Sequence, residues 1–170
     1  MELEPERVHK LVREMLLERP NIFGAQGHNF LLNPPLPESK VAAFEQRHSI
    51  VLPADYRYFI TRVANGGAGP FYGVFRLGEM DEKPWREGEG LVGVLSQPFP
   101  HREAWNDLSG MPPNELYDSD EDEAERQRIA FEKNYYDNKW VNGAIPICHE
   151  GCAIRIWLVV TGEEAGHLWE

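Results

Sequence analysis

The clearest candidate for metal chemistry in this sequence is the run from Cys148 to Cys152, in which two cysteines flank a histidine and a glutamate. Thiolates and imidazole are good zinc ligands. The two thiols could alternatively form a disulfide across a turn, although disulfides are rare in a reducing cytosol. No second pair of Cys or His residues stands at ligand spacing elsewhere in the chain. We therefore favour a strand–turn–strand that buries two small residues, and we predict no metal and no cofactor.

An acidic run, DSDEDEAE at 118–125, carries six carboxylates in eight residues. Its alternating aspartates resemble the start of an EF-hand loop, which requires glycine at its sixth position and glutamate at its twelfth. Glu123 and Ile129 occupy those positions here, so the calcium-loop interpretation fails. Because such runs are more often solvated, we expect a surface loop, with weak, non-specific cation binding as the alternative.

The glycine-rich stretch GGAG at 66–69 invites comparison with phosphate-binding loops. Those loops follow a strand and open a helix, whose N-terminus supplies the N–H groups. The glycines here follow a predicted helix and precede a predicted strand at 74–77. They therefore indicate a helix cap and a tight turn.

No arrangement of nucleophile and base stands out in the sequence. The G-x-S-x-G and H-E-x-x-H motifs are absent, and neither cysteine stands in a known protease setting. Four histidines are scattered along the chain without an evident partner: His28, His48, His101 and His167. We therefore predict a protein that is not an enzyme and has no catalytic residue.

Length, composition and charge limit the class of protein. The 170 residues suit one domain better than two, and 42% hydrophobic residues indicate a folded chain. No apolar run approaches the roughly 18 residues that span a bilayer, and the charged N-terminus lacks a secretory signal. We expect a soluble, cytoplasmic protein without membrane contact. A net charge of −11 disfavours nucleic-acid binding and suits a basic protein partner, although solubility alone gives many cytosolic proteins such a charge.

Helical periodicity and proline positions predict three helices in the first part of the chain, at 4–19, 37–48 and 53–65. A short strand is expected near 30–32, within the loop after the first helix. The first helix carries an apolar stripe that should pack on the body of the domain, with a partner groove as the alternative. The stripe consists of Val8, Leu11, Val12, Met15 and Leu16.

The middle of the chain predicts little regular structure. We expect a surface loop at 79–90 and an irregular segment at 96–123, because four prolines interrupt it. A short helix is predicted at 125–136. The residues expected to face inward from it are Ile129, Phe131 and Tyr136.

The C-terminal part has the clearest strand pattern. Branched and aromatic residues predict strands at 144–148, 152–161 and 167–169. Short turns at 149–151 and 161–166 would join them into an antiparallel meander. Helices first and strands later indicate an α+β fold.

The stretch at 52–77, LPADYRYFITRVANGGAGPFYGVFRL, resembles the core signature of the SUKH superfamily, in its branch related to fungal cell-wall-synthesis regulators. That signature is a leucine-proline pair, a tyrosine, an apolar helix, Asn-Gly-Gly-x-Gly-Pro and an aromatic-glycine strand. The matching residues are Leu52, Pro53, Tyr56, Phe59, Ile60, Asn65, Gly66, Gly67, Gly69, Pro70, Tyr72 and Gly73. The segments at 36–48 and 143–169 are similar to the elements that flank the signature in the family.

The resemblance implies one SUKH-like α+β domain over 1–170, with a mixed or largely antiparallel sheet flanked by helices. It does not extend to 79–140, which we expect to be an irregular acidic insertion. Family members continue past the final tryptophan strand. We therefore expect either that the chain is truncated at Glu170 or that a partner covers the exposed strand edge. The signature residues carry over as fold-defining residues and not as an active site.

Many bacterial members of the superfamily are predicted immunity proteins, which bind and neutralise cognate toxins of polymorphic toxin systems, often nucleases or deaminases. The resemblance implies that this chain occludes the active site of a basic toxin, with complementary charge speeding the encounter. The alternatives are a regulatory scaffold with an endogenous partner and, less favoured, an enzyme or ligand-binding protein with a pocket near the glycines at 66–69. The predicted contact residues, each of which could instead be ordinary surface or core, are Asp118, Asp120, Glu121, Asp122 and Glu123, with Tyr72, Trp85 or Trp105 as aromatic anchors.

Overall fold

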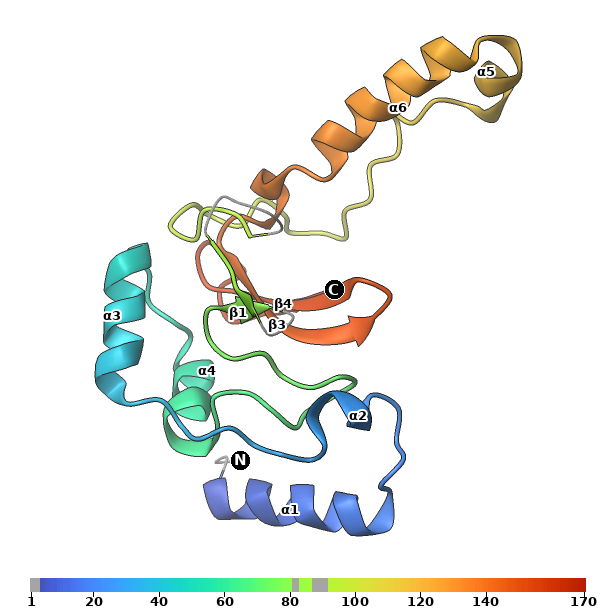
Figure 1. The fold of residues 1–170 in the computed structure, drawn as a ribbon. Coiled ribbons are helices and arrows are strands. Elements are labelled where there is room, and N and C mark those ends of the chain that lie inside the picture. Colours follow the sequence, from blue (N-terminus) through green and yellow to red (C-terminus); the bar gives the residue numbers. More distant parts are fainter. Residues whose placement is uncertain (1–3, 81–82, 87–91) are drawn as a thin grey trace.

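The computed structural model describes residues 4–80, 83–86 and 92–170, and it has the α+β organisation that the sequence predicts. The three predicted helices are confirmed, and a further short helix follows the first. In Figure 1 these helices lie to the left of and below the strands formed by the C-terminal part of the chain. The helices are α1 (Pro5–Glu18), α2 (Ala25–His28), α3 (Glu38–His48) and α4 (Ala54–Tyr58), which continues into the π-helical turn η1 (Phe59–Val63).

The leucine-proline link determines how α4 leaves α3. Pro53 occupies the N-cap of α4 with φ −51° and ψ 135°, and the helix begins at the next residue. Leu52 N donates a hydrogen bond to the Glu45 carboxylate of α3 (2.9 Å). The same carboxylate pairs with Arg57 of α4, which also pairs with Glu38 (2.7 Å). A charged network therefore joins the two helices beside the core.

Three antiparallel strands form the main sheet, in the order β3-β4-β5. They are β3 (Ala144–Gly151), β4 (Ile154–Val159) and β5 (Leu168–Trp169). The predicted meander is confirmed, but its first turn lies later than predicted. His149 still belongs to β3, and the turn is formed by Cys152 and Ala153, with φ of 49° and 67°. Two successive residues with positive φ give a tight hairpin turn whose twist matches that of the strands.

Single backbone bridges extend this sheet beyond β3. Val74 bridges to Cys148 of β3, Gly67 bridges to Val74, and Leu32 bridges to Gly67, all antiparallel. The short strands predicted around Leu32 and Val74 are therefore reduced to single bridges. Pro34 and Pro35 follow Leu32 closely, and a tight turn that begins at Pro70 precedes Val74. Neither segment can therefore pair over a longer stretch.

Gly67 lies at the centre of this extension. Its N–H donates to Val74 O and its carbonyl accepts from Val74 N, both at 2.8 Å. Next to it, Ala68 N donates to Leu31 O (2.6 Å). Gly67 has a φ of 104°, where side chains of L-residues are strained. A Cβ on it would also lie closer to Leu31 O than van der Waals contact allows, so this position requires glycine for two separate reasons.

The other signature residues also stabilise this corner of the chain. Asn65 is buried, and its Oδ1 accepts a hydrogen bond from Leu77 N (3.0 Å). Pro70 O accepts from Gly73 N (2.9 Å), and Tyr56 packs against the hydrophobic core. We call this region the glycine corner; its residues are Asn65, Gly66, Gly67, Gly69, Pro70, Tyr72 and Gly73.

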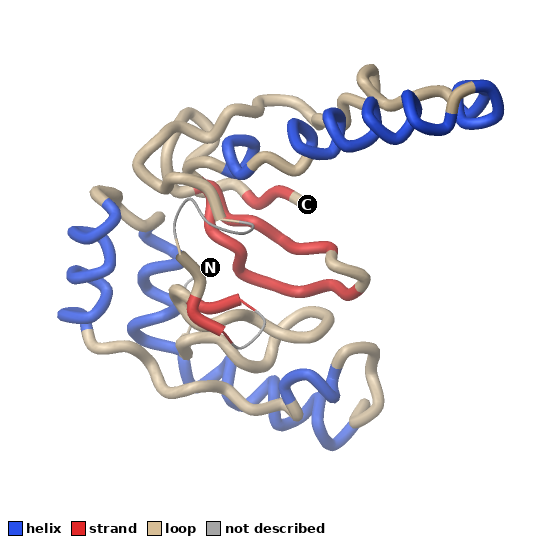
Figure 2. Tube along the Cα trace, turned by 45° about the horizontal axis from the view of Figure 1, so that its top comes forward, coloured by secondary structure: helices blue, strands red, loops and turns tan. Residues whose placement is uncertain are grey.

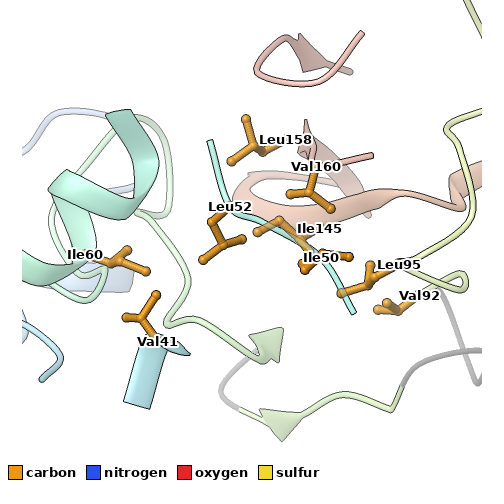
Figure 3. Packing of buried hydrophobic residues seen from close by; sticks show 9 residues of the cluster. All are labelled: Val41, Ile50, Leu52, Ile60, Val92, Leu95, Ile145, Leu158 and Val160. Atoms are coloured by element: carbon orange, nitrogen blue, oxygen red, sulfur yellow. The ribbon is translucent and has the colours of Figure 1, made fainter. Parts of the chain in front are cut away.

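One hydrophobic cluster fills the space between helices and sheet (Figure 3). Its members come from α3, η1, the link before α4, the sheet and the segment at 92–95. They are Val41, Ile50, Leu52, Ile60, Val92, Leu95, Ile145, Leu158 and Val160. Val92 and Leu95 belong to no helix or strand, yet both are fully buried. The core therefore also holds the segment 92–95 in place, from which the chain continues towards the two helices at 114–135.

The beginning of the segment 79–140 is not the loop that the sequence predicts. β1 (Glu79–Met80) pairs antiparallel with β2 (Lys83–Pro84) in a small two-stranded sheet. The remaining residues of the predicted loop, at 81–82 and 87–90, lie outside the described residues.

Two further helices, α5 (Asn114–Ser119) and α6 (Glu121–Tyr135), form an arm that extends away from the sheet (Figures 1 and 2). The helix α5 contradicts the irregular stretch predicted at 96–123, whereas α6 confirms the helix predicted at 125–136 and begins four residues earlier. The segment 79–140 is therefore not the irregular insertion that we expected. The prolines do not prevent α5, because Pro113 lies at its N-cap, where a missing N–H costs nothing. Neither α6 nor any other helix in the described ranges is long and apolar enough to cross a membrane.

The inward residues predicted for α6 are mostly wrong. Ile129 and Tyr136 are 55% and 67% exposed, and Phe131 is half-buried. Ala124 is the buried residue of this helix. The sequence analysis assumed that this helix packs on the domain core. In the structure α6 lies in the arm, where its neighbour is α5, so most of its apolar side chains are not covered. A 3-10 turn, η2 (Asn138–Val141), then leads back to β3.

The helix α1 packs on the body less closely than its apolar stripe predicts. Val8 and Val12 are half-buried, and His9 Nε2 donates to Val63 O of η1 (3.3 Å). The rest of the stripe is exposed: Leu11, Met15 and Leu16. The predicted packing is therefore confirmed for only part of the stripe.

We expect Gly67→Ala to destabilise the fold far more than Gly166→Ala. Both glycines have positive φ, 104° and 96°, so alanine strains the backbone at each by about 1 kcal/mol. Only at Gly67 does the new Cβ also meet a backbone carbonyl, because nothing lies within 4 Å of it at Gly166. Urea unfolding should show a loss of more than about 3 kcal/mol for Gly67→Ala. Equal losses for the two variants would contradict the steric role of Gly67.

Candidate partner-binding site

The predicted acidic contact residues lie where α5 joins α6, at the end of the arm farthest from the sheet (Figure 1). The run at 118–125 is therefore helical and not the solvated loop that we expected. Asp120 Oδ1 accepts a hydrogen bond from Glu123 N (3.0 Å) and caps α6. Acidic residues in a first turn are also favoured by the helix dipole. Capping and the dipole together explain why the acidic run lies at the N-terminus of α6.

The carboxylates at this tip differ in how far they are compensated. Glu123 is half-buried and pairs with Arg126 (2.6 Å). Asp118, Glu121 and Asp122 are exposed, and no hydrogen bond or ion pair of the described part of the chain engages their carboxylates. These three residues, which we call the acidic tip, present negative charge to solvent.

Farther along α6 the charges compensate one another. Arg128 pairs with Glu125 (2.6 Å) and with Glu132. The hydrogen bonds with Glu125 and then Glu132 raise the pKa of Arg128, and the bond with Arg128 lowers the pKa of Glu125. Pairs at these spacings support a helix that has few tertiary contacts. The uncompensated charge of α6 is thus concentrated at its N-terminal end.

A groove lined mainly by aromatic side chains lies at the other end of α6, where the arm joins the body. Its cavity volume is about 520 Å³. Because α6 has 15 residues and a helix rises 1.5 Å per residue, about 20 Å separates this groove from the acidic tip. We call it the aromatic groove; its phenylalanine, tyrosine and tryptophan rings are Phe99, Trp105, Tyr135, Tyr136, Trp140, Trp157 and Trp169.

The inner rings of the aromatic groove are held in place by stacking and hydrogen bonds. Trp105 stacks on Trp140 with 4.7 Å between ring centroids, and on Tyr135 with 5.4 Å. Trp140 Nε1–H donates to Asn134 O (2.6 Å), and the Tyr135 hydroxyl donates to Asn106 Oδ1 (2.7 Å). The indole N–H of Trp140 and the hydroxyl of Tyr135 thus both have partners. The groove is therefore preformed, and little conformational entropy is lost when a ligand binds.

The ionisable groups in the wall of the groove give it a negative character. His101 Nε2 donates to Trp140 O (3.0 Å). Burial lowers the pKa of His101, and this hydrogen bond offsets the effect only in part, so its imidazole is neutral at pH 7. Apart from the tyrosines, the other ionisable side chains of the lining are the carboxylates of Asp137 and Glu170.

Of the three predicted aromatic anchors, Trp105 lies in the aromatic groove and the other two lie elsewhere. Trp85 packs against the hydrophobic core, where its ring meets Phe44 edge-on at 5.9 Å. Tyr72 lies at the glycine corner and stacks on His149 at 5.2 Å. The structure therefore does not bring Tyr72 or Trp85 together with the arm.

The sequence did not predict the other tryptophans of the groove as site residues. For two of them a signal was present, because Trp157 stands opposite Trp169 in the register of β4 and β5. A meander with correct register places both side chains on one face of the sheet. Trp140 carries no such signal, since its position depends on the direction in which the arm leaves the body.

A second cavity, of about 680 Å³, lies beside the glycine corner, where the small-ligand alternative placed a pocket. His28 is among its lining residues and is 8% exposed. Its Nδ1 accepts a hydrogen bond from Phe30 N (2.9 Å), and its Nε2 is buried without a partner among the described residues. Burial lowers the pKa of His28, so this imidazole is neutral at pH 7.

The Cys148–Cys152 run is not arranged as a metal site. Cys148 is buried, its Sγ donates to Pro70 O (3.4 Å), and burial raises the pKa of its thiol to about 11. A metal would require the thiolate. Cys152 is exposed, so the prediction that both cysteines are buried is wrong for Cys152. Within the described ranges, no group of three or more His, Cys, Asp or Glu side chains could hold a metal ion.

Comparison with known families agrees with the signature at the glycine corner. The model of the SMI1 / KNR4 family (SUKH-1) matches residues 35–169. The chain belongs to this family. The match covers the glycine corner, the sheet and the arm, including the segment 79–140 to which the sequence signature did not extend, whereas α1 and α2 precede it. No curated protein and no solved structure matches the chain.

We expect Asp120→Ala to loosen the arm and Asp120→Asn to leave it folded. Alanine removes the cap of α6, which costs about 1 kcal/mol, whereas asparagine retains a capping oxygen. Hydrogen exchange should be faster at residues 121–127 in Asp120→Ala alone, with β3 and β4 unchanged in both variants. The same exchange rates in both variants would show that the cap does not stabilise the arm.

We also expect stability to fall as the pH drops from 7.5 towards 5. Burial lowers the pKa of His28 and of His101. Below about pH 6.5 the unfolded chain therefore binds protons that the folded chain does not, and the free energy of unfolding decreases. Urea unfolding at both ends of this range should show a shallower decline for His28→Gln, and a still shallower one when His101→Gln is added. Parallel declines in all three proteins would exclude these histidines as the cause.

Proposed function

We propose that the chain is an immunity protein that binds a cognate toxin of a polymorphic toxin system, of nuclease or deaminase type, and occludes its active site. Membership in the SUKH-1 family supports this class of function. The net charge of −11 supports a basic partner. The observation that carries the proposal further is the acidic tip, where uncompensated carboxylates lie at the junction of α5 and the capped helix α6, on an arm that projects from the body.

The proposed mechanism is electrostatic guidance followed by steric blocking. A nuclease or deaminase that acts on nucleic acid needs a positive surface near its active site, because its substrate is a polyanion. The acidic tip can bind to such a surface in place of the nucleic acid. Because the arm projects, it can also enter a concave site that a flat surface cannot. Complementary charge raises the association rate, and salt reduces this effect. The mechanism uses no catalytic residue of the chain.

A regulatory scaffold that binds an endogenous basic partner would use the same surface. The two functions differ in their genetic setting, because an immunity protein is encoded next to the toxin that it neutralises. The identity of the adjacent gene therefore separates them. The cavity beside the glycine corner favours a third function, the binding of a small ligand, and a ligand that copurifies there would support it.

The direct test is co-expression with the toxin encoded by the neighbouring gene. Cells that produce the toxin alone should die, and cells that also produce this chain should survive and yield a complex of the two proteins. Death in the presence of folded, soluble chain would contradict the proposal.

The acidic tip can be tested in the same complex. The triple variant Asp118→Asn/Glu121→Gln/Asp122→Asn should bind with an association rate about tenfold lower at low salt, and the difference should shrink in 0.5 M NaCl. A matched control makes the same change in charge at exposed residues of the N-terminal region, with Glu4→Gln/Glu6→Gln/Glu18→Gln. If both triple variants associate equally fast, the charge of the tip has no specific role.

A further inference from the structure

The aromatic groove combines exposed aromatic faces with carboxylates. Tyr136 is 67% exposed, and Trp157 and Trp169 are half-buried on neighbouring strands. Asp137 and Glu170 are exposed at the same groove. Aromatic faces carry negative electrostatic potential and attract cations. The Glu170 carboxylate adds a negative charge beside them, whereas the Asp137 carboxylate is paired with Lys139.

The chain itself places a cation on one ring of this groove. Lys139 Nζ lies 4.6 Å from the centroid of the Trp140 ring. It also donates to Asn134 Oδ1 (2.7 Å) and lies 3.6 Å from Asp137 Oδ2. A ring and a carboxylate of the groove thus already hold an ammonium group together. Trp140 also stacks against Trp105, so a guest must use the outer rings.

The charge of the groove decides between the guests that aromatic walls can accept. A neutral apolar guest would leave the carboxylates unused, a sugar would engage them only through uncharged hydroxyl groups, and an acidic guest would be repelled by them. An arginine side chain uses both features, because its planar guanidinium stacks on rings while its N–H groups pair with a carboxylate. Arginine, tyrosine and tryptophan are also the side chains that most often dominate the affinity of protein interfaces.

We propose that the aromatic groove binds an arginine side chain of a partner protein, stacked on Tyr136, Trp157 and Trp169 and paired with the carboxylate of Glu170. The identity of that partner as a toxin rests on the proposed function. The preference of the groove for a guanidinium group does not, so it can be measured without any toxin.

The test is a titration of the full chain with N-acetyl-arginine amide, followed by the indole N–H signals in NMR. The matched control ligand is N-acetyl-citrulline amide, which has nearly the same shape without the charge. We expect saturable shifts of the Trp157 and Trp169 signals, and at least fivefold weaker binding of the citrulline compound. Trp85 packs against the core with its indole Nε1 buried, so its signal should not shift and provides an internal control.

Two variants locate the site. Tyr136→Ala removes an exposed ring of the groove, and Glu170→Gln removes one of its charges. Each should weaken arginine binding at least threefold. Tyr58→Ala removes a ring that is 43% exposed on α4, away from the groove, and should bind arginine as the unchanged protein does.

Three results would overturn the inference. Equal binding of the arginine and citrulline compounds would show a groove that does not sense charge. Tighter binding of the neutral sugar cellotriose than of arginine would make it a carbohydrate site. An absence of shifts up to 50 mM ligand would show that the groove takes no cation. In each of these cases the proposed function would still hold if the chain formed a complex with the toxin in co-expression. If the groove bound arginine and the chain bound no toxin, the groove would be a cation site for another partner.

Discussion

The reciprocal pair of backbone hydrogen bonds between Gly67 and Val74 is the interaction on which the other parts of the structure depend. It lies between the last helical turn and β3, because Val74 also bridges to Cys148, so it connects the helices to the sheet. The hydrophobic cluster fills the space between them, with members from both sides. Glycine at position 67 is therefore a requirement of the fold.

Local signals in the sequence were sufficient for the elements that local physics determines. Prolines and apolar periodicity located α3 and α4, and branched residues located β3 and β4. The acidic run was misread because six carboxylates suit a solvated loop and a helix start equally well. The spacing of Asp120 and Glu123, which is that of a capping box, was the feature that distinguishes them. The turn at Cys152 and Ala153 could not be predicted so easily, because residues other than glycine carry little signal for positive φ.

The site depends on tertiary structure to a greater degree. Its charged half is contiguous in the sequence, so its membership was predictable even though its shape was not. Its aromatic half gathers residues from 99 to 170 that meet only after β5 has paired with β4 and the arm has left the body. The two halves also suit different stages of association. Exposed charge acts at a distance and governs the rate of encounter, whereas ring contacts act at short range and govern the lifetime of a complex.

The arm owes its stability largely to itself. Ala124 is buried within it, Asp120 caps its long helix, and Arg128 pairs with neighbours on the same helix. Substitutions at its outer end therefore cost the rest of the domain almost nothing. Evolution can exchange those side chains one at a time while the glycine corner and the core stay constant. The outer end of the arm is thus thermodynamically uncoupled from the glycine corner and the core, so its surface can change without a loss of stability in the rest of the domain.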